Sequence, residues 1–276
     1  MIDFIHLFQY QFFQNAVIAI LLTSIIAAMI GTYIVARKIV FISGGITHAS
    51  FGGIGLAYFL GFNPLLGASL FAIFTATTIE WLSHKGKVRE DSAIAILWSL
   101  GMALGIIFVF LTPGYAPNLM SFLFGSILSV GKFDLIILTF LFVITTLLFL
   151  FFYRSIVQTA FDAEFAKIMG TKVMFFRYLM SVLIALSIVI SIRVMGIILV
   201  LSIFTIPQSI AMLFANSFKK IIPWALLWSI TGSLIGLFVA YRMDIPSGAA
   251  IVFILTILYL IVKGVMLIKE HLNKTS

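Results

Sequence analysis

One histidine stands out among the ionisable residues of this 276-residue sequence. His48 lies inside a long apolar stretch, in a run of small residues, whereas most of the acidic residues fall in loops or at the ends of such stretches. An ionisable group at membrane depth is costly, so it usually faces a cavity or a partner group. A neutral imidazole is also a common ligand of transition metals. His48 therefore belongs either to a metal pathway or to a structural hydrogen bond with a neighbouring backbone carbonyl.

Glu80 is the second candidate, about one turn inside the end of another apolar stretch. Its carboxylate could line a transport pathway or extend to the membrane surface. An enzyme is disfavoured. His48 and Ser50 are two apart, so on a helix they point in different directions and form no catalytic dyad. The sequence contains no HExxH, GxSxG or Walker motif, and it has no cysteine to act as a nucleophile or a metal ligand.

The composition defines the environment of these residues. Hydrophobic residues make up 63% of the chain and charged residues 9%, against about 25% charged in an average soluble domain. The mean hydropathy is +1.24. These values exclude a soluble globular domain and a disordered chain. At about 20 residues for each membrane crossing, we expect an all-α polytopic membrane protein, a single transmembrane domain over residues 1–276 with about eight to nine transmembrane helices.

The apolar stretches give the predicted spans. They are residues 16–36, 39–62, 65–82, 92–111, 135–153, 178–192, 194–215, 221–241 and 249–268. Residues 119–130 are apolar but too few to cross a bilayer, so we expect a re-entrant or interfacial segment there.

The basic residues predict an orientation. If the N-terminus is outside and the C-terminus cytoplasmic, only Lys132, Arg193 and Arg242 of the 17 lysine and arginine residues fall on the outer side. Cytoplasmic loops are enriched in basic residues, which accounts for the net charge of +8 without a nucleic-acid partner.

Residues 155–177 form the longest amphipathic stretch and are expected on the cytoplasmic side. Asp162 is suited to cap a helix, and Glu164 in the first turn favours its start. Gly170 is suited to end it. The result is a short helix that presents Phe165, either an interfacial helix or a docking helix for a cytoplasmic partner. A membrane chain without its own energy module needs such a partner.

Four segments in order resemble the bacterial ABC-type permeases that import zinc, manganese or iron, and the resemblance extends over roughly residues 39–262. The segments are residues 45–53, 90–96, 161–170 and 193–211, with a weaker match at residues 244–248. The resemblance implies a homodimeric permease in the lipid bilayer of the bacterial cytoplasmic (inner) membrane. It implies a cytoplasmic ABC ATPase that binds ATP, an extracytoplasmic metal-binding protein, and a transported divalent metal instead of a permanently bound cofactor.

The resemblance also assigns residues. It implies that His48 belongs to the metal path, where the family pairs this histidine with an aspartate four residues earlier. Here that position is Gly44, and Glu80 is a distant candidate for the missing carboxylate. The small residues around His48 allow close helix packing and a widened pathway; they are Gly44, Gly45, Thr47, Ser50, Gly52 and Gly53. The expected ATPase-coupling residues are Asp162, Glu164, Phe165, Lys167 and Gly170.

Imidazole ligation favours zinc, manganese or iron over magnesium or calcium, and we expect zinc first, with manganese next. The main alternative is a secondary, ion-coupled transporter, which would need an acidic residue near mid-membrane; Glu80 is the one candidate for that. A membrane scaffold would leave the docking helix unexplained. A vitamin B12 or siderophore importer would be expected to have a larger, differently patterned permease.

Overall fold

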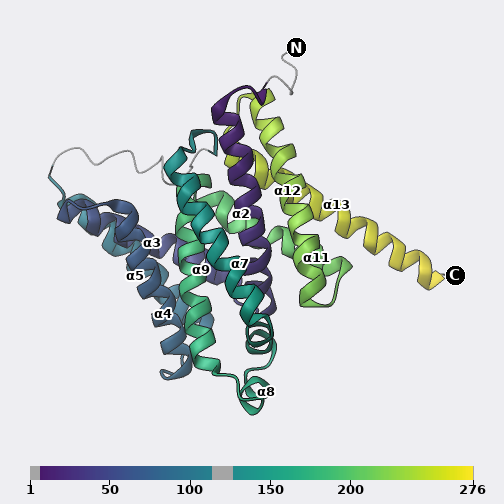
Figure 1. The fold of residues 1–276 in the computed structure, drawn as a ribbon, viewed down its shortest axis with the longest axis horizontal. Helices are drawn as coiled ribbons and strands as arrows, with labels where there is room; N and C mark the ends of the chain where they lie inside the picture. Colours follow the sequence, from purple (N-terminus) through teal and green to yellow (C-terminus); the bar gives the residue numbers. More distant parts are fainter. Residues whose placement is uncertain (1–6, 114–126, 276) are drawn as a thin grey trace.

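The computed structural model describes residues 7–113 and 127–275, and in these ranges every regular element is a helix (Figure 1). The elements are, in chain order, α2 (Gln11–Ala36), α3 (Phe41–Leu60), α4 (Pro64–His84), α5 (Glu90–Leu111), the 3-10 helix η1 (Ile127–Ser129), α7 (Lys132–Phe161), α8 (Ala163–Ile168), α9 (Val173–Met195), α10 (Ile197–Ile203), α11 (Ile206–Phe214), α12 (Phe218–Met243) and α13 (Ser247–Thr275).

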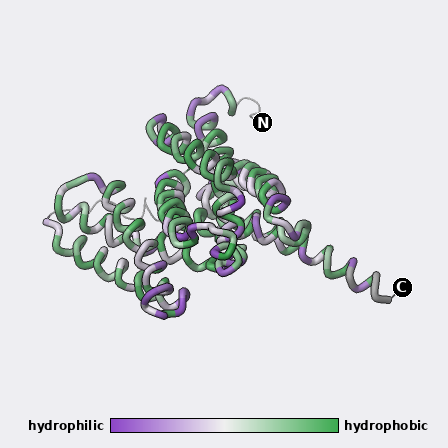
Figure 2. The backbone as a smooth tube through the Cα atoms, turned by 60° about the horizontal axis from the view of Figure 1, so that its bottom comes forward, coloured by the Kyte–Doolittle hydropathy of each residue, from purple (hydrophilic) through white to green (hydrophobic). Residues whose placement is uncertain are grey.

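The prediction of an all-α polytopic membrane protein is confirmed. Within the described ranges, eight segments are long and apolar enough to cross a membrane, with α10 and α11 together forming one of them. The 20-residue helix α3 falls outside this set because its glycines and polar residues lower its hydropathy. Figure 2 shows hydrophobic residues along the helices and hydrophilic residues gathered at the turns between them. Of the short segment expected at residues 119–130, residues 119–126 lie outside the described ranges, and η1 follows them.

The long helices form a central group with two flanks (Figure 1). Helices α2, α7, α9 and α12 run lengthwise through the middle, where α2 packs against α7 and α12. Helices α3, α4 and α5 pack together on one flank and join the centre mainly through α4 and α9. On the other flank α13 packs against α12 before its C-terminal part extends away from the bundle.

Glycines bring α3 into close contact with its two neighbours. A Cβ atom added to Gly52 would lie 2.8 Å from the backbone oxygen of Gly101 in α5, and one on Gly55 would lie 2.5 Å from that of Gly105. On its other side, a Cβ on Gly53 would overlap the backbone of Gly67 in α4. Such contacts between small residues let helix backbones approach within a membrane.

The turn between α3 and α4 follows from three residues. Gly61 ends α3 in the left-handed conformation, with a φ of +74°, which glycine adopts at no steric cost. The side chain of Asn63 accepts a hydrogen bond of 2.9 Å from the backbone N–H of Leu65. Pro64 occupies the first turn of α4, where its missing N–H costs nothing.

The span expected at residues 194–215 is present as a candidate membrane crossing over Ile197–Phe214, and it consists of two helices with a break between them. The break lies between α10 and α11, at Phe204 and Thr205. Pro207 has no N–H to donate to the carbonyl four residues earlier, that of Ile203. The buried side-chain amide of Gln208 donates to this carbonyl instead, at 3.3 Å, and to Ala27 of α2 at 2.7 Å. The break is therefore stabilised by a side chain that also holds it against α2.

Ion pairs mark the two ends of the bundle. At the end where α7 begins and α9 stops, Arg193 donates to Asp134 at 2.5 Å. At the opposite end, where α2 stops and α9 begins, Arg37 and Arg177 both contact Glu80. Helix α8 lies at this second end, beyond the long helices (Figure 1).

Candidate functional site

His48 lies on the face of α3 that meets α5, and its side chain is half-buried. The imidazole stacks on the indole of Trp98, with ring centroids 4.5 Å apart and planes 8° apart. Gly44 lies one helical turn before His48 and faces the same indole, because a Cβ atom added to Gly44 would lie 3.3 Å from Cζ3 of Trp98. An aromatic ring thus occupies the space beside the position where the resemblance predicts an aspartate.

The remaining small residues near His48 are buried as well, with Gly45 and Gly52 against α5 and Gly53 against α4. The Oγ of Ser50 donates to the carbonyl of Thr47 at 2.7 Å. The Oγ1 of Thr47 is buried and has no hydrogen-bond partner within the described residues. Gly45 leaves room for the side chain of Ile94, which a Cβ atom would meet at 2.5 Å. No three histidine, aspartate or glutamate side chains of the described ranges gather around one point, so the structure groups no further such side chains with His48 into a metal-binding cluster.

Glu80 lies elsewhere, in a buried ion-pair cluster. Its side chain is 2% exposed and contacts Arg37 at 3.1 Å and Arg177 at 3.2 Å. The Oγ of Ser181 donates to the same carboxylate at 3.4 Å. Arg37 also contacts Glu90 at 2.6 Å. The structure assigns Glu80 to this cluster, which joins α2, α4, α5 and α9, and no described contact connects it with His48.

The charges of the cluster balance one another, as buried charges must. Burial acts to lower the pKa of Arg37, but the carboxylates of Glu80 and Glu90 raise it above its ordinary value, so the guanidinium stays charged. Sequence reasoning missed this role of Arg37 and Arg177, and it missed Trp98 altogether. A glutamate inside an apolar stretch indicates that a basic side chain pairs with it. The sequence spacing does not indicate which basic residue that is.

The short helix α8 has the ends that the sequence predicts. The Oδ1 of Asp162 accepts hydrogen bonds from the backbone N–H groups of Glu164 at 3.0 Å and Phe165 at 2.9 Å. At the other end Gly170 has a φ of +79°. Its N–H donates to Lys167, and the next N–H, that of Thr171, donates to Ala166; this pattern is a Schellman motif. A rigid turn of helix results, with the side chain of Phe165 half exposed.

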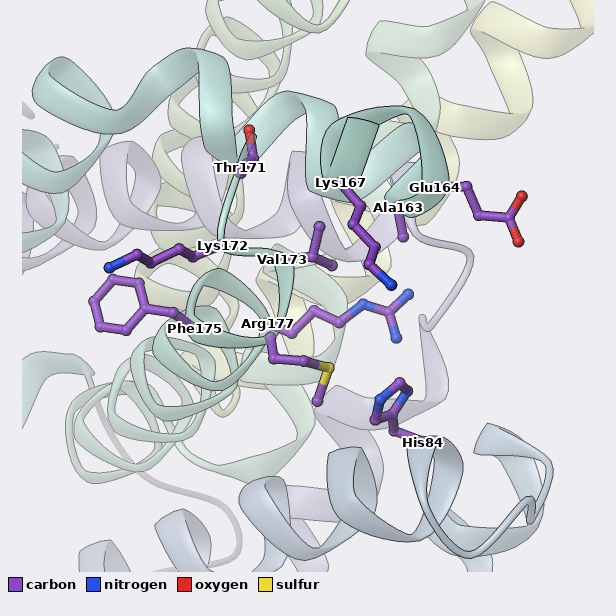
Figure 3. Close-up of a pocket in the computed structure, with 10 residues that line it drawn as sticks. His84, Ala163, Glu164, Lys167, Thr171, Lys172, Val173, Phe175 and Arg177 are labelled. Carbon is purple, nitrogen blue, oxygen red and sulfur yellow. The ribbon is translucent and has the colours of Figure 1, made fainter. Parts of the chain in front are cut away.

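A pocket of about 510 Å³ lies beside α8. It is lined by α8, the link to α9, the first turns of α9, and His84 at the end of α4. Figure 3 shows the amine of Lys167 and the guanidinium of Arg177 pointing toward one another, with the imidazole of His84 opposite and the carboxylate of Glu164 pointing away. The pocket is therefore positively charged. Arg177 belongs both to the lining of this pocket and to the Glu80 cluster.

The helices define a polytopic α-helical membrane protein. It has a packed contact between α3 and α5 around His48, and a buried ion-pair cluster around Glu80 at one end of the bundle. The chain belongs to the ABC 3 transport family, whose sequence model matches residues 9–266. It is 36% identical to the membrane protein slr2045 of Synechocystis, over 92% of this chain and 90% of that protein. It is 32% identical to the manganese transport system membrane protein MntC of Listeria monocytogenes, over 92% and 91%.

A solved structure is similar over nearly the whole chain. It is described as PsaBC from Streptococcus pneumoniae in complex with Fab. The matching chain has a TM-score of 0.81 and 32% sequence identity, with 93% of this chain and 92% of that chain covered. The family that the sequence motifs resemble is thereby confirmed.

Proposed function

We propose that this chain is the permease subunit of an ABC importer that carries a divalent transition-metal ion into the cytoplasm. Its membership of the ABC 3 transport family carries the proposal, and the similarity to a manganese transport protein supports the metal. The sequence alone favoured zinc, but the relative's name gives no support to that preference. Manganese is therefore the first ion to test, with zinc and iron as competitors. A secondary transporter is not favoured.

The proposal requires partners. ATP is bound and hydrolysed by a separate cytoplasmic ATPase, a metal-binding protein delivers the ion from outside, and a second copy of this chain completes the permease. The distribution of basic residues supports a cytoplasmic location for the end that carries α8, with the N-terminus outside and the C-terminus inside. The membrane is the bacterial cytoplasmic (inner) membrane.

In this mechanism His48 acts as a transient ligand. A neutral imidazole binds borderline divalent ions, and a single protein nitrogen binds them weakly enough to release them. Helices α3, α4 and α5 move as one body, because glycines let the backbone of α3 touch the backbones of α4 and α5 without intervening side chains. Helix α8 contacts the ATPase and moves with it. The Glu80 cluster transmits this movement to α2, α4, α5 and α9, because it joins the ends of these four helices.

The test uses the tagged chain co-expressed with its ATPase and metal-binding protein and reconstituted in lipid vesicles. We expect ATP hydrolysis and ion uptake to be stimulated by the binding protein loaded with manganese, more than with zinc or iron. His48→Ala should lower uptake at limiting metal, whereas the control His271→Ala, on the C-terminal part of α13, should leave it unchanged. A chain that purifies without an ATPase and takes up ions in response to a proton gradient would contradict the proposal and revive the secondary transporter.

A further inference from the structure

Another pocket lies at the start of α12, on the outside of the bundle. It has a volume of about 570 Å³ and is lined by Lys219, Lys220, Pro223, Trp224 and Leu227. All five residues are exposed. Their spacing of three and four residues places them on one face of the helix. This face therefore points away from the packed centre, toward whatever surrounds the protein.

The lining combines two cations with an apolar wall. Among the described residues neither Lys219 nor Lys220 forms an ion pair, and no residue that lines the pocket is acidic. The wall continues into α12, which is apolar enough to cross a membrane. Lysines near the end of a membrane helix extend their amines to the level of the lipid headgroups. The pocket thus places two unpaired amines where water meets hydrocarbon.

The apolar wall is held in place by stacked rings. Trp224 stacks on Phe214, the last residue of α11, with ring centroids 4.9 Å apart and planes 17° apart. Phe214 also stacks on Trp228, at 6.0 Å and 19°. Helices α11 and α12, which lie side by side (Figure 1), are joined by these rings. Tryptophan is enriched at the membrane–water boundary, so the wall has the composition expected at headgroup depth.

We infer that this pocket binds an anionic phospholipid. The phosphate of the headgroup lies between the amines of Lys219 and Lys220, and the start of an acyl chain lies along Trp224 and Leu227. Two cations without a carboxylate favour an anion. The apolar wall favours a lipid over inorganic phosphate, which would leave the wall uncovered. Neither a transported ion nor an ATPase enters the argument, so the inference is independent of the proposed function.

The test uses the fluorescence of Trp224 in the full chain, with Trp81, Trp98 and Trp228 replaced by phenylalanine. The chain is reconstituted in phosphatidylcholine vesicles that contain either brominated phosphatidylglycerol or brominated phosphatidylcholine. Bromine on an acyl chain quenches a tryptophan in contact with it. The ratio of the two quenching efficiencies measures the preference of the pocket for the anionic lipid.

We expect brominated phosphatidylglycerol to quench Trp224 more strongly than brominated phosphatidylcholine. In the double variant Lys219→Gln/Lys220→Gln this preference should fall at least about fivefold, the contribution of one lysine near an anionic surface. Quenching by brominated phosphatidylcholine should stay the same, which shows that the variant is folded and inserted like the parent. An excess of inorganic phosphate should leave the preference unchanged.

The matched control is Lys85→Gln/Lys87→Gln, which removes the same charge from the exposed turn after α4 and should keep the preference. The inference is overturned if both lipids quench the parent equally or if Lys219→Gln/Lys220→Gln keeps the preference. It is also overturned if the control loses the preference as strongly, because overall charge would then select the lipid, or if inorganic phosphate abolishes it. Absence of quenching by either lipid, with loss of a dimer from Lys219→Gln/Lys220→Gln in native mass spectrometry, would show instead that a second copy of the chain covers the pocket.

Discussion

The indole ring of Trp98 lies flat on the imidazole of His48, with 4.5 Å between ring centroids, and its edge fills the space beside Gly44. A side chain at position 44 and a large ring at position 98 therefore compete for one volume. Stacked aromatic pairs contribute about 0.5–1.5 kcal/mol beyond the area they bury. The stack fixes the plane of the imidazole, so Trp98 is a positioning residue for the proposed metal ligand.

The stack makes Trp98 a reporter of metal binding. In a chain with Trp81, Trp224 and Trp228 replaced by phenylalanine, we expect Mn²⁺ to quench the emission of Trp98, because a paramagnetic ion on the imidazole lies next to the ring. His48→Ala should remove this quenching, and Mg²⁺, which imidazole binds poorly, should not cause it. Equal quenching in the His48→Ala chain would mean that the ion does not bind at this histidine.

The competition between positions 44 and 98 can be measured with a double-mutant cycle. Gly44→Asp alone should destabilise the chain by about 1–3 kcal/mol, because the added side chain is forced against the indole. In a Trp98→Ala background the same change should cost less, with a coupling of at least about 0.5 kcal/mol. Thermal unfolding of the four chains in detergent gives the coupling. Additive effects would show that the two side chains do not share the volume.

The buried position of Glu80 predicts a structural cost. Glu80→Gln leaves Arg37 and Arg177 without their shared carboxylate, and breaking a buried pair in this way costs about 3–5 kcal/mol. The matched control is Asp91→Asn, whose partner Arg89 is 3.8 Å away on the surface; an exposed pair contributes at most about 1 kcal/mol. Unfolding midpoints in detergent distinguish the two. A Glu80→Gln chain as stable as the control would contradict the cluster.

Most of the fold could be predicted from the sequence, because apolar stretches of sufficient length have few alternatives to membrane helices. The caps of α8 could be predicted as well, since Asp162 and Gly170 act on backbone groups within four residues of themselves. The break near Phe204 could not, although Pro207 gave a local signal. Its stability depends on Gln208 reaching Ala27, 181 residues away in the chain.

The candidate site divides in the same way. The sequence predicts that His48 and Glu80 lie in apolar surroundings. It does not predict their partners, because the partners lie on other helices. Glu80 takes Arg37 and Arg177, which are 43 and 97 residues away. Trp98 carries no sequence signal for its place on His48, since it is one of three aromatic residues in an apolar helix.

The contact between α3 and α5 gives the last prediction. Gly52→Ala places a Cβ atom 2.8 Å from the carbonyl oxygen of Gly101, a backbone atom that cannot rotate away as a side chain would. The helices must separate, and we expect the free energy of unfolding to fall by about 1–3 kcal/mol, as for overpacked cores.

The control is Gly264→Ala in α13, where an added Cβ meets nothing within 4 Å. Replacing a helical glycine there should be neutral or should stabilise the chain by up to about 1 kcal/mol. Thermal unfolding in detergent compares the two chains, and metal uptake in vesicles should fall only for Gly52→Ala. If both alanine variants behave alike, the backbone contact between Gly52 and Gly101 does not hold α3 against α5.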